Sequence, residues 1–258
     1  MTHSHRLLQR LAAAVAAGLL GLASAHAESV SVAVAANFTE PAKALAAQLK
    51  ETTGHEALLS FGATGAFYTQ ITEGAPFDVF LAADDERPKL LEQEDAIFPG
   101  SRFTYAIGQL VLWSAQEAKV DADGKVLEQG DFNKLAIANP KLAPYGAAAV
   151  QTMAWLGLSQ QLEPKLVMGA SIGQTLNFVA TGNADLGFVA LSQVLVDGKL
   201  RGGSMWRVPA EAHAPIVQDA VVLKRAAGNP AAQAWVELLR SPQTRELLRS
   251  QYGYDTPD

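Results

Sequence analysis

The pattern of apolar and polar positions is most regular near the start of the chain. Residues 29–38 alternate and then become continuously apolar, and one face of this stretch carries Val30, Val32 and Val34. Such a pattern is typical of a buried β-strand. A helical pattern follows at once, because apolar residues then recur at spacings of four, three and four, at Phe38, Ala42, Leu45 and Leu49. The first structured unit is therefore predicted to be a strand, a short turn and a helix.

The turn between this strand and helix contains Asn37, which we expect to be the N-cap of the helix. Glu40 would complete a capping box, and Pro41 would lie in the first turn, where its missing N–H does little harm. A helix that begins at the carboxyl end of a parallel strand offers free N–H groups and a positive dipole end to an anion. The simpler alternative is an ordinary first strand–helix unit without a ligand.

The same alternation continues along the chain. Further strands are predicted at 56–61, 76–82, 135–138, 165–168 and 185–191, most of them followed by a helical pattern, and two helices are predicted at the end, at 230–240 and 242–251. Strands that alternate with helices indicate an α/β fold with parallel sheets. Two long extended stretches, 103–114 and 215–224, are each suited to connect two lobes.

These two connections predict that the second lobe is inserted in the first. We expect lobe 1 to comprise 28–107 plus 218–258, and lobe 2 to comprise 108–217, with the ligand cleft between the lobes.

The first 27 residues are predicted to be a secretory signal peptide. Arg6 and Arg10 provide a basic start, residues 11–22 form a short apolar core, and Ala25-His26-Ala27 is typical of a cleavage site. The apolar core is too short for a comfortable membrane anchor, which is the alternative. We therefore expect a periplasmic protein that is cleaved after Ala27.

Composition narrows the possible functions. Of 20 Lys and Arg, two lie in the predicted signal peptide, so the remaining 18 against 26 Asp and Glu give the mature chain a formal charge of −8. This balance argues against nucleic acid and anionic membranes as partners. The chain has no cysteine, and only His55 and His213 follow the signal peptide, which argues against a zinc or thiolate site.

Four turns that precede predicted helices share one character. Each is small or glycine-rich: Ala36-Asn37, Gly62-Ala63-Thr64-Gly65, Pro144-Tyr145-Gly146 and Ser171-Ile172-Gly173. Ligands of open α/β sheets lie at the carboxyl ends of the strands, so all four turns are expected to face one cleft. No Lys or Arg occurs in 60–86 or 166–198. An anion in this cleft would therefore be held by neutral dipoles, although ordinary helix capping is the alternative for any single turn.

At these residues the chain resembles the periplasmic molybdate-binding proteins of ABC transporters. The resemblance covers nearly the whole mature chain and is carried by VAVAANFTEPAKALA at 32–46, SFGATGAFYTQITEGAPFDVFLAAD at 60–84, ANPKLAPYG at 138–146 and SIGQTLNFVATGNADLGFVA at 171–190. It implies a type II periplasmic-binding-protein fold, in which two α/β lobes close on molybdate or tungstate. It also implies a monomer without enzymatic activity or cofactor, whose partner is the membrane permease of an ABC importer.

The resemblance further implies which residues hold the oxyanion. They are Asn37, Ala63, Thr64, Tyr145 and Ile172, and molybdenum would be bound only as molybdate, through Asn37, Thr64, Tyr145 and Ile172. Some relatives place a ligand-binding Tyr after the second-lobe strand where this chain has Ala190. We expect Tyr145 to supply that hydroxyl from the other side. The sequence does not separate molybdate from tungstate, and sulfate, thiosulfate or phosphate are weaker alternatives.

One motif supports a different class of protein. Residues 169–173 match the G-x-S-x-G nucleophile elbow, and Ser171, Asp185 and His213 follow the order of the triad in α/β-hydrolases. No HGGG-type oxyanion loop accompanies them, and Asp185 precedes its strand instead of following it. An exported hydrolase is therefore retained only as the alternative.

Overall fold

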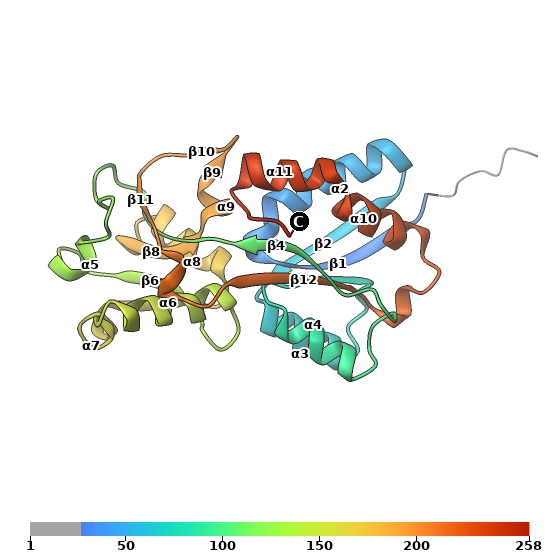
Figure 1. Ribbon diagram of the computed structural model, residues 1–258, viewed down its shortest axis with the longest axis horizontal. Helices are drawn as coiled ribbons and strands as arrows, with labels where there is room; N and C mark the ends of the chain where they lie inside the picture. The colour runs from blue at the N-terminus through green and yellow to red at the C-terminus, as the bar shows by residue number, and fades with distance from the viewer. Residues whose placement is uncertain (1–26, 258) are drawn as a thin grey trace, which may run out of the picture.

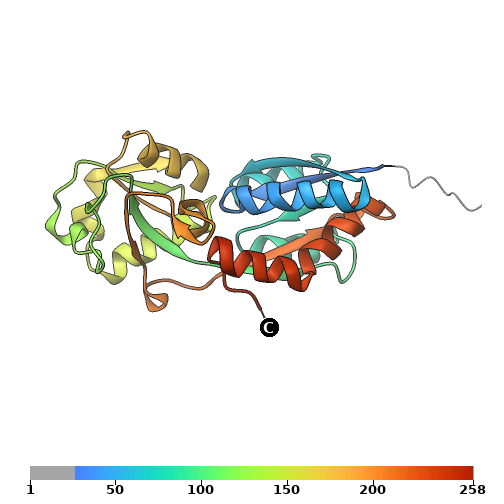
Figure 2. The same cartoon turned by 90° about the horizontal axis from the view of Figure 1, so that it is seen from above.

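Two five-stranded sheets, one in each lobe, form the framework of the protein (Figures 1 and 2). The computed structural model describes residues 27–257, so the predicted signal peptide lies outside it apart from Ala27. Within 27–257, no helix has both the length and the apolar character needed to cross a membrane.

The sheet of the first lobe has the strand order β2-β1-β3-β12-β4, and helices cover both of its faces (Figure 1). Its strands are β1 Ser29–Ala35, β2 Glu56–Gly62, β3 Val79–Leu81, β4 Phe103–Gly108 and β12 Ile216–Val222. Its helices are α2 Thr39–Thr53, α3 Thr64–Thr72, α4 Glu86–Gln93, α10 Pro230–Arg240 and α11 Pro242–Tyr252. β1 pairs in parallel with β2 and β3, whereas β12 is antiparallel to β3 and β4.

The sheet of the second lobe has the order β11-β5-β8-β6-β7. Its strands are β5 Leu110–Ser114, β6 Leu135–Ala138, β7 Leu166–Gly169, β8 Leu186–Ala190 and β11 Ser204–Arg207, beside a small ribbon of β9 Leu195–Val196 and β10 Lys199–Leu200. Its helices are α5 Val126–Gln129, α6 Pro144–Trp155, α7 Ser159–Leu162, α8 Ile172–Ala180 and α9 Leu191–Val194. Short 3-10 helices lie at Ala36–Phe38 (η1), Glu163–Lys165 (η2), Ala210–Ala212 (η3) and Lys224–Ala226 (η4).

Two neighbouring strands lead the chain from one lobe to the other. β4 ends at Gly108, directly before the second lobe begins with β5, and β12 returns the chain to the first lobe. β4 and β12 pair with each other, Gly108 opposite Ile216, so the two crossings lie side by side (Figure 1). The α/β fold with two lobes and the two extended connections is confirmed; the exact lobe boundaries, at 107/108 and 217/218, stay a prediction.

The alternation of side chains along β1 separates two cores in the first lobe. Val30, Val32 and Val34 face α2 and the C-terminal helices, in a cluster that includes Leu45 and Trp235. Ala33 faces the other side and packs with side chains of α3 and α4, among them Phe67 and Leu91. The face predicted for the three valines is therefore confirmed.

The predicted capping box at Asn37 is wrong. The chain makes a 3-10 turn at Ala36–Phe38 before α2 begins at Thr39, so Phe38 takes the N-cap position and no side chain caps the helix. Asn37 is instead 2% exposed, with its side chain directed into the protein. The sequence analysis also missed the short elements from α9 to β11, which have too few residues for a recognisable period.

A buried carboxylate on the crossing strand β12 has its charge compensated by one cation. The side chain of Asp219 is 2% exposed and accepts hydrogen bonds from Arg102 at 2.8 Å and from the Thr104 hydroxyl at 2.7 Å. Arg102 also pairs at 2.7 Å with Glu92, whose side chain is 40% exposed. The inner ion pair therefore compensates a buried charge, whereas the outer pair is solvated.

Arg102→Met should destabilise the first lobe, because it leaves the buried Asp219 carboxylate without a cation. We expect a loss of about 2–4 kcal/mol in the free energy of unfolding, measured by urea denaturation. Glu92→Gln is the matched control, because it removes the exposed partner of the same arginine and should cost less than about 1 kcal/mol. Equal losses from the two variants would contradict this assignment.

Candidate functional site

Residues from all four glycine-rich or small turns line one cavity between the lobes. Its walls are built by Ala35, Ala36, Asn37, Gly62, Ala63, Thr64, Ala83, Ala143, Pro144, Tyr145 and Ile172. η1, α3, α6 and α8 begin at these turns, so four helix N-termini meet there. The cavity is small: the centre of a water-sized sphere has about 10 Å³ open to it there, against about 250 Å³ in the hollow beside it. The cavity therefore has no room for an organic solute and could hold only a small ion.

All five residues predicted to hold an oxyanion lie on this cavity, and none of its lining residues carries a charge. The first lobe provides Asn37, Ala63 and Thr64, and the second lobe provides Tyr145 and Ile172. Since the first N–H groups of a helix have no partner within it, the starts of α3 and α8 provide donors without charged side chains. Ala190, at the end of β8, is fully buried and does not line the cavity.

Two hydroxyl groups at the cavity can donate a hydrogen bond to a ligand there. The Thr64 hydroxyl accepts a hydrogen bond from the Ala83 N–H at 3.0 Å, and the Tyr145 hydroxyl accepts one from Gln218 Nε2 at 3.2 Å. Among residues 27–257, neither hydroxyl is the donor in any hydrogen bond. Because a hydroxyl has a single proton, both protons remain available to an acceptor in the cavity.

Burial keeps the Tyr145 hydroxyl in its donating form. It raises the pKa of this group well above its ordinary value, and nearby Tyr254 acts in the same direction. The Gln218 amide, which donates to this hydroxyl, and the neighbouring Asn37 amide act against the rise. With its pKa above the ordinary value, the Tyr145 hydroxyl stays protonated through the physiological pH range.

The Asn37 side chain belongs to an internal network. Its Nδ2 donates to Gln218 Oε1 at 2.8 Å and to the Tyr254 hydroxyl at 2.9 Å, which uses both of its protons. Its backbone carbonyl accepts from the Ser192 hydroxyl of the second lobe at 2.9 Å. Asn37 Oδ1 is buried and has no partner among the described residues. For the Asn37 side chain to donate to an anion, its amide has to turn over, so that role stays a prediction.

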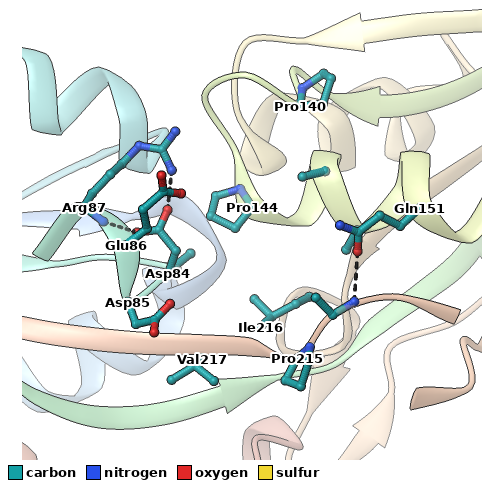
Figure 3. Close-up of a pocket in the computed structure, with 14 residues that line it drawn as sticks. Asp84, Asp85, Glu86, Arg87, Pro140, Pro144, Gln151, Pro215, Ile216 and Val217 are labelled. Carbon is teal, nitrogen blue, oxygen red and sulfur yellow. Dashed lines mark hydrogen bonds and ion pairs between the residues drawn. The ribbon is translucent and has the colours of Figure 1, made fainter. Parts of the chain in front are cut away.

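The hollow beside the cavity is acidic on one wall. Asp84, Asp85 and Glu86 lie there with Arg87, opposite Pro140, Pro144 and Gln151 (Figure 3). Arg87 pairs with Asp84 and also donates to the Lys141 carbonyl of the second lobe at 3.0 Å. Burial raises the pKa of the Asp84 carboxyl, which the charge of Arg87 opposes. Carboxylates repel an anion, so the neutral cavity and not this hollow is the candidate oxyanion site.

The residues of the hydrolase alternative do not meet. The Ser171 hydroxyl caps α8 by accepting from the Gln174 N–H, and the Asp185 carboxylate accepts from the N–H groups of Asn133 and Lys134. The His213 ring nitrogen Nδ1 lies 2.7 Å from the Ala214 carbonyl oxygen, which is its one hydrogen-bond partner among residues 27–257. Each side chain has a local structural role, and no triad is formed. Nor do residues 27–257 contain a group of three or more His, Asp or Glu able to hold a metal ion.

Three residues behind the cavity were not found from the sequence. Gln218 lies on the crossing strand β12, Tyr254 follows α11, and Ser192 lies in α9. They come from distant parts of the chain and meet only through strand pairing and lobe contact, so no local pattern indicates them.

Two α/β lobes joined by paired crossing strands, with a small cavity between them, define a solute-binding protein. Residues 30–255 match the family described as "Bacterial extracellular solute-binding protein". The chain belongs to this family.

Named relatives within this class are molybdate-binding proteins. The chain is 58% identical to "Molybdate-binding protein ModA" of Azotobacter vinelandii over 96% of this chain and 97% of that protein. It is 54% identical to the protein of the same name from Rhodobacter capsulatus, over 96% of each chain. The solved periplasmic molybdate-binding protein of Azotobacter vinelandii superposes with a TM-score of 0.86 and 41% identity, over 89% of this chain and 100% of that one. The sulfate-binding protein SubI of Mycobacterium tuberculosis, 13% identical with a TM-score of 0.70, shares the fold.

Proposed function

We propose that this protein captures molybdate, and also tungstate, in the periplasm and delivers it to the membrane permease of an ABC importer. The observation that carries the proposal is the neutral cavity where four helix N-termini meet. Dipoles directed from both lobes at one point stabilise an anion without a cationic side chain. The names of relatives that are more than half identical support molybdate as the ligand.

The proposed ligand is cargo, so the protein needs neither a catalytic group nor a cofactor. Ala63 and Thr64 would hold it from the first lobe, together with Asn37 through its backbone N–H, because both protons of the Asn37 side-chain amide are used within the protein. Tyr145 and Ile172 would hold it from the second lobe. Because these donors face one ion only when the lobes are close together, binding favours the closed arrangement. A monomer that exposes both lobes to the permease would suffice for delivery.

The direct test is a calorimetric panel of oxyanions against the mature protein. We expect molybdate and tungstate to bind tightly and sulfate weakly, because the smaller sulfate ion cannot reach the donors of both lobes at once. Thiosulfate and phosphate complete the panel. Sulfate binding as tight as molybdate binding would refute the proposed ligand.

Tyr145→Phe should weaken molybdate binding while leaving the fold intact, because the ring still packs and only the hydroxyl is lost. An oxyanion oxygen short of one donor in a desolvated cavity costs about 1–3 kcal/mol, which is about 5- to 150-fold in Kd. The melting temperature without ligand should fall modestly, because the buried Gln218 Nε2 loses its acceptor, and the rise with ligand should shrink. Parent affinity in this variant would remove Tyr145 from the ligand set.

Gly65→Ala should test closure of the lobes. The Gly65 N–H donates to the Leu142 carbonyl of the second lobe at 2.8 Å, and a Cβ at Gly65 would lie 3.0 Å from the Leu142 Cα. Crowding of about 1–3 kcal/mol in the closed form would weaken binding about 5- to 150-fold. Since alanine favours a helix over glycine, the unligated protein should melt no lower than the parent.

Gln70→Ala, on the exposed part of the same helix α3, is the control for Gly65→Ala. Because ligand should close the lobes, small-angle scattering of the parent should show a smaller radius with molybdate. Gln70→Ala should leave both this decrease and the affinity unchanged. If Gly65→Ala also left them unchanged, the contact between Gly65 and Leu142 would have no part in binding.

A further inference from the structure

Gln218 lies at the centre of the polar network behind the cavity. It is on the crossing strand β12 and is fully buried. Its Oε1 accepts from Asn37 Nδ2 at 2.8 Å and lies 3.1 Å from the Tyr105 hydroxyl, while its Nε2 donates to the Tyr145 hydroxyl at 3.2 Å. One amide on the connection between the lobes thus contacts a proposed ligand residue from each lobe.

The orientation of the Gln218 amide decides the direction of the Tyr145 proton. Because Nε2 has no lone pair to accept with, the Tyr145 hydroxyl can only receive a hydrogen bond from this side. Its own proton must go elsewhere, and the hydroxyl borders the cavity. With the amide reversed, Oε1 would take the Tyr145 proton away from a ligand.

Neighbouring contacts hold the Gln218 amide in the observed orientation. Tyr105 has an acceptor in the Ala82 carbonyl at 2.8 Å, and both protons of the Asn37 amide are used, one of them on Gln218 Oε1. Reversing Gln218 alone would bring two N–H donors together at Asn37. Gly108 closes the remaining side, since a Cβ there would lie 2.1 Å from the Tyr145 hydroxyl and 2.6 Å from Gln218 Nε2. The network leaves Gln218 and Tyr145 little freedom to rearrange.

We propose that Gln218 is a positioning residue for oxyanion binding, which acts by directing the Tyr145 proton into the cavity. This inference rests on the proposed function, because it assumes that an oxyanion occupies the cavity. It adds a residue that does not line the cavity and therefore does not touch the ligand.

The test is a double-mutant cycle with molybdate as the titrant. Gln218→Met keeps the approximate side-chain length and removes both hydrogen-bonding groups, and it should weaken binding about tenfold. In the Tyr145→Phe background the same change should cause no further loss, because the hydroxyl through which Gln218 acts is absent. Gln109→Met is the control, since this amide lies next to Gly108 but bonds Asp255, and it should bind like the parent.

Gln218→Glu adds a readout that a merely structural role would not produce. A buried carboxyl is neutral at about pH 6, where it can donate and accept like the amide, and it ionises towards about pH 9, where it can only accept. At about pH 6, Gln218→Glu should bind molybdate about as tightly as the parent. Between about pH 6 and about pH 9, the affinity of the variant should fall at least about tenfold more than the affinity of the parent. This variant also provides the test if Gln218→Met does not fold.

The outcomes separate the inference from the function on which it rests. Parent protein that binds no molybdate or tungstate would refute the proposed function. Parent protein that binds, with Gln218→Met equally tight or with losses that multiply in the double variant, would overturn the role of Gln218 alone. Gln218→Glu whose affinity followed the parent's at both pH values would overturn it as well.

Discussion

The proposed oxyanion site depends on one constraint, that a charged ligand has to be held without charged side chains. Burying an uncompensated ion is costly, and the lining of the cavity between the lobes has no cation to reduce the cost. What remains is the set of N–H groups and dipoles at the starts of helices. These can meet at one point only if the carboxyl ends of the strands in both sheets face each other, which the paired crossings of β4 and β12 achieve.

The crossing strands also carry the polar groups that set the direction of the donors. Gly108 ends β4 and Gln218 lies on β12, and both contact the Tyr145 hydroxyl of the second lobe. Lobe 1 contributes Asn37 to the same network, and the chain after α11 contributes Tyr254. These residues connect the two lobes and also line or support the site. A change in the distance between the lobes must therefore also change the hydrogen bonds of the site.

Which features of the fold and the site could be predicted from the sequence depends on how far apart in the chain the interacting residues lie. The convergence of the four turns followed from a topological rule, that parallel strands present their carboxyl ends at one edge, together with the absence of Lys and Arg in 60–86 and 166–198. The Asn37 cap was wrong because a 3-10 turn moved the helix start by one residue and directed the side chain inward. A local pattern cannot distinguish these two outcomes, since Asn is suited to either. Gln218 is 181 residues from Asn37, and its role depends on strand pairing.

The charge distribution around the site shows where affinity and selectivity must arise. The chain has a formal charge of −6, and Asp84, Asp85 and Glu86 line the hollow beside the cavity, so the field of the protein opposes an approaching dianion. Arg87 does not offset this for the ligand, because it is engaged with Asp84 and with the Lys141 carbonyl. In the proposed site, attraction must therefore come from short-range contacts inside the cavity. Hydrogen bonds of fixed direction discriminate by the positions of oxygen atoms, whereas a cationic side chain would attract any anion of the same charge. A site of this design sacrifices long-range attraction and gains selectivity for size and geometry.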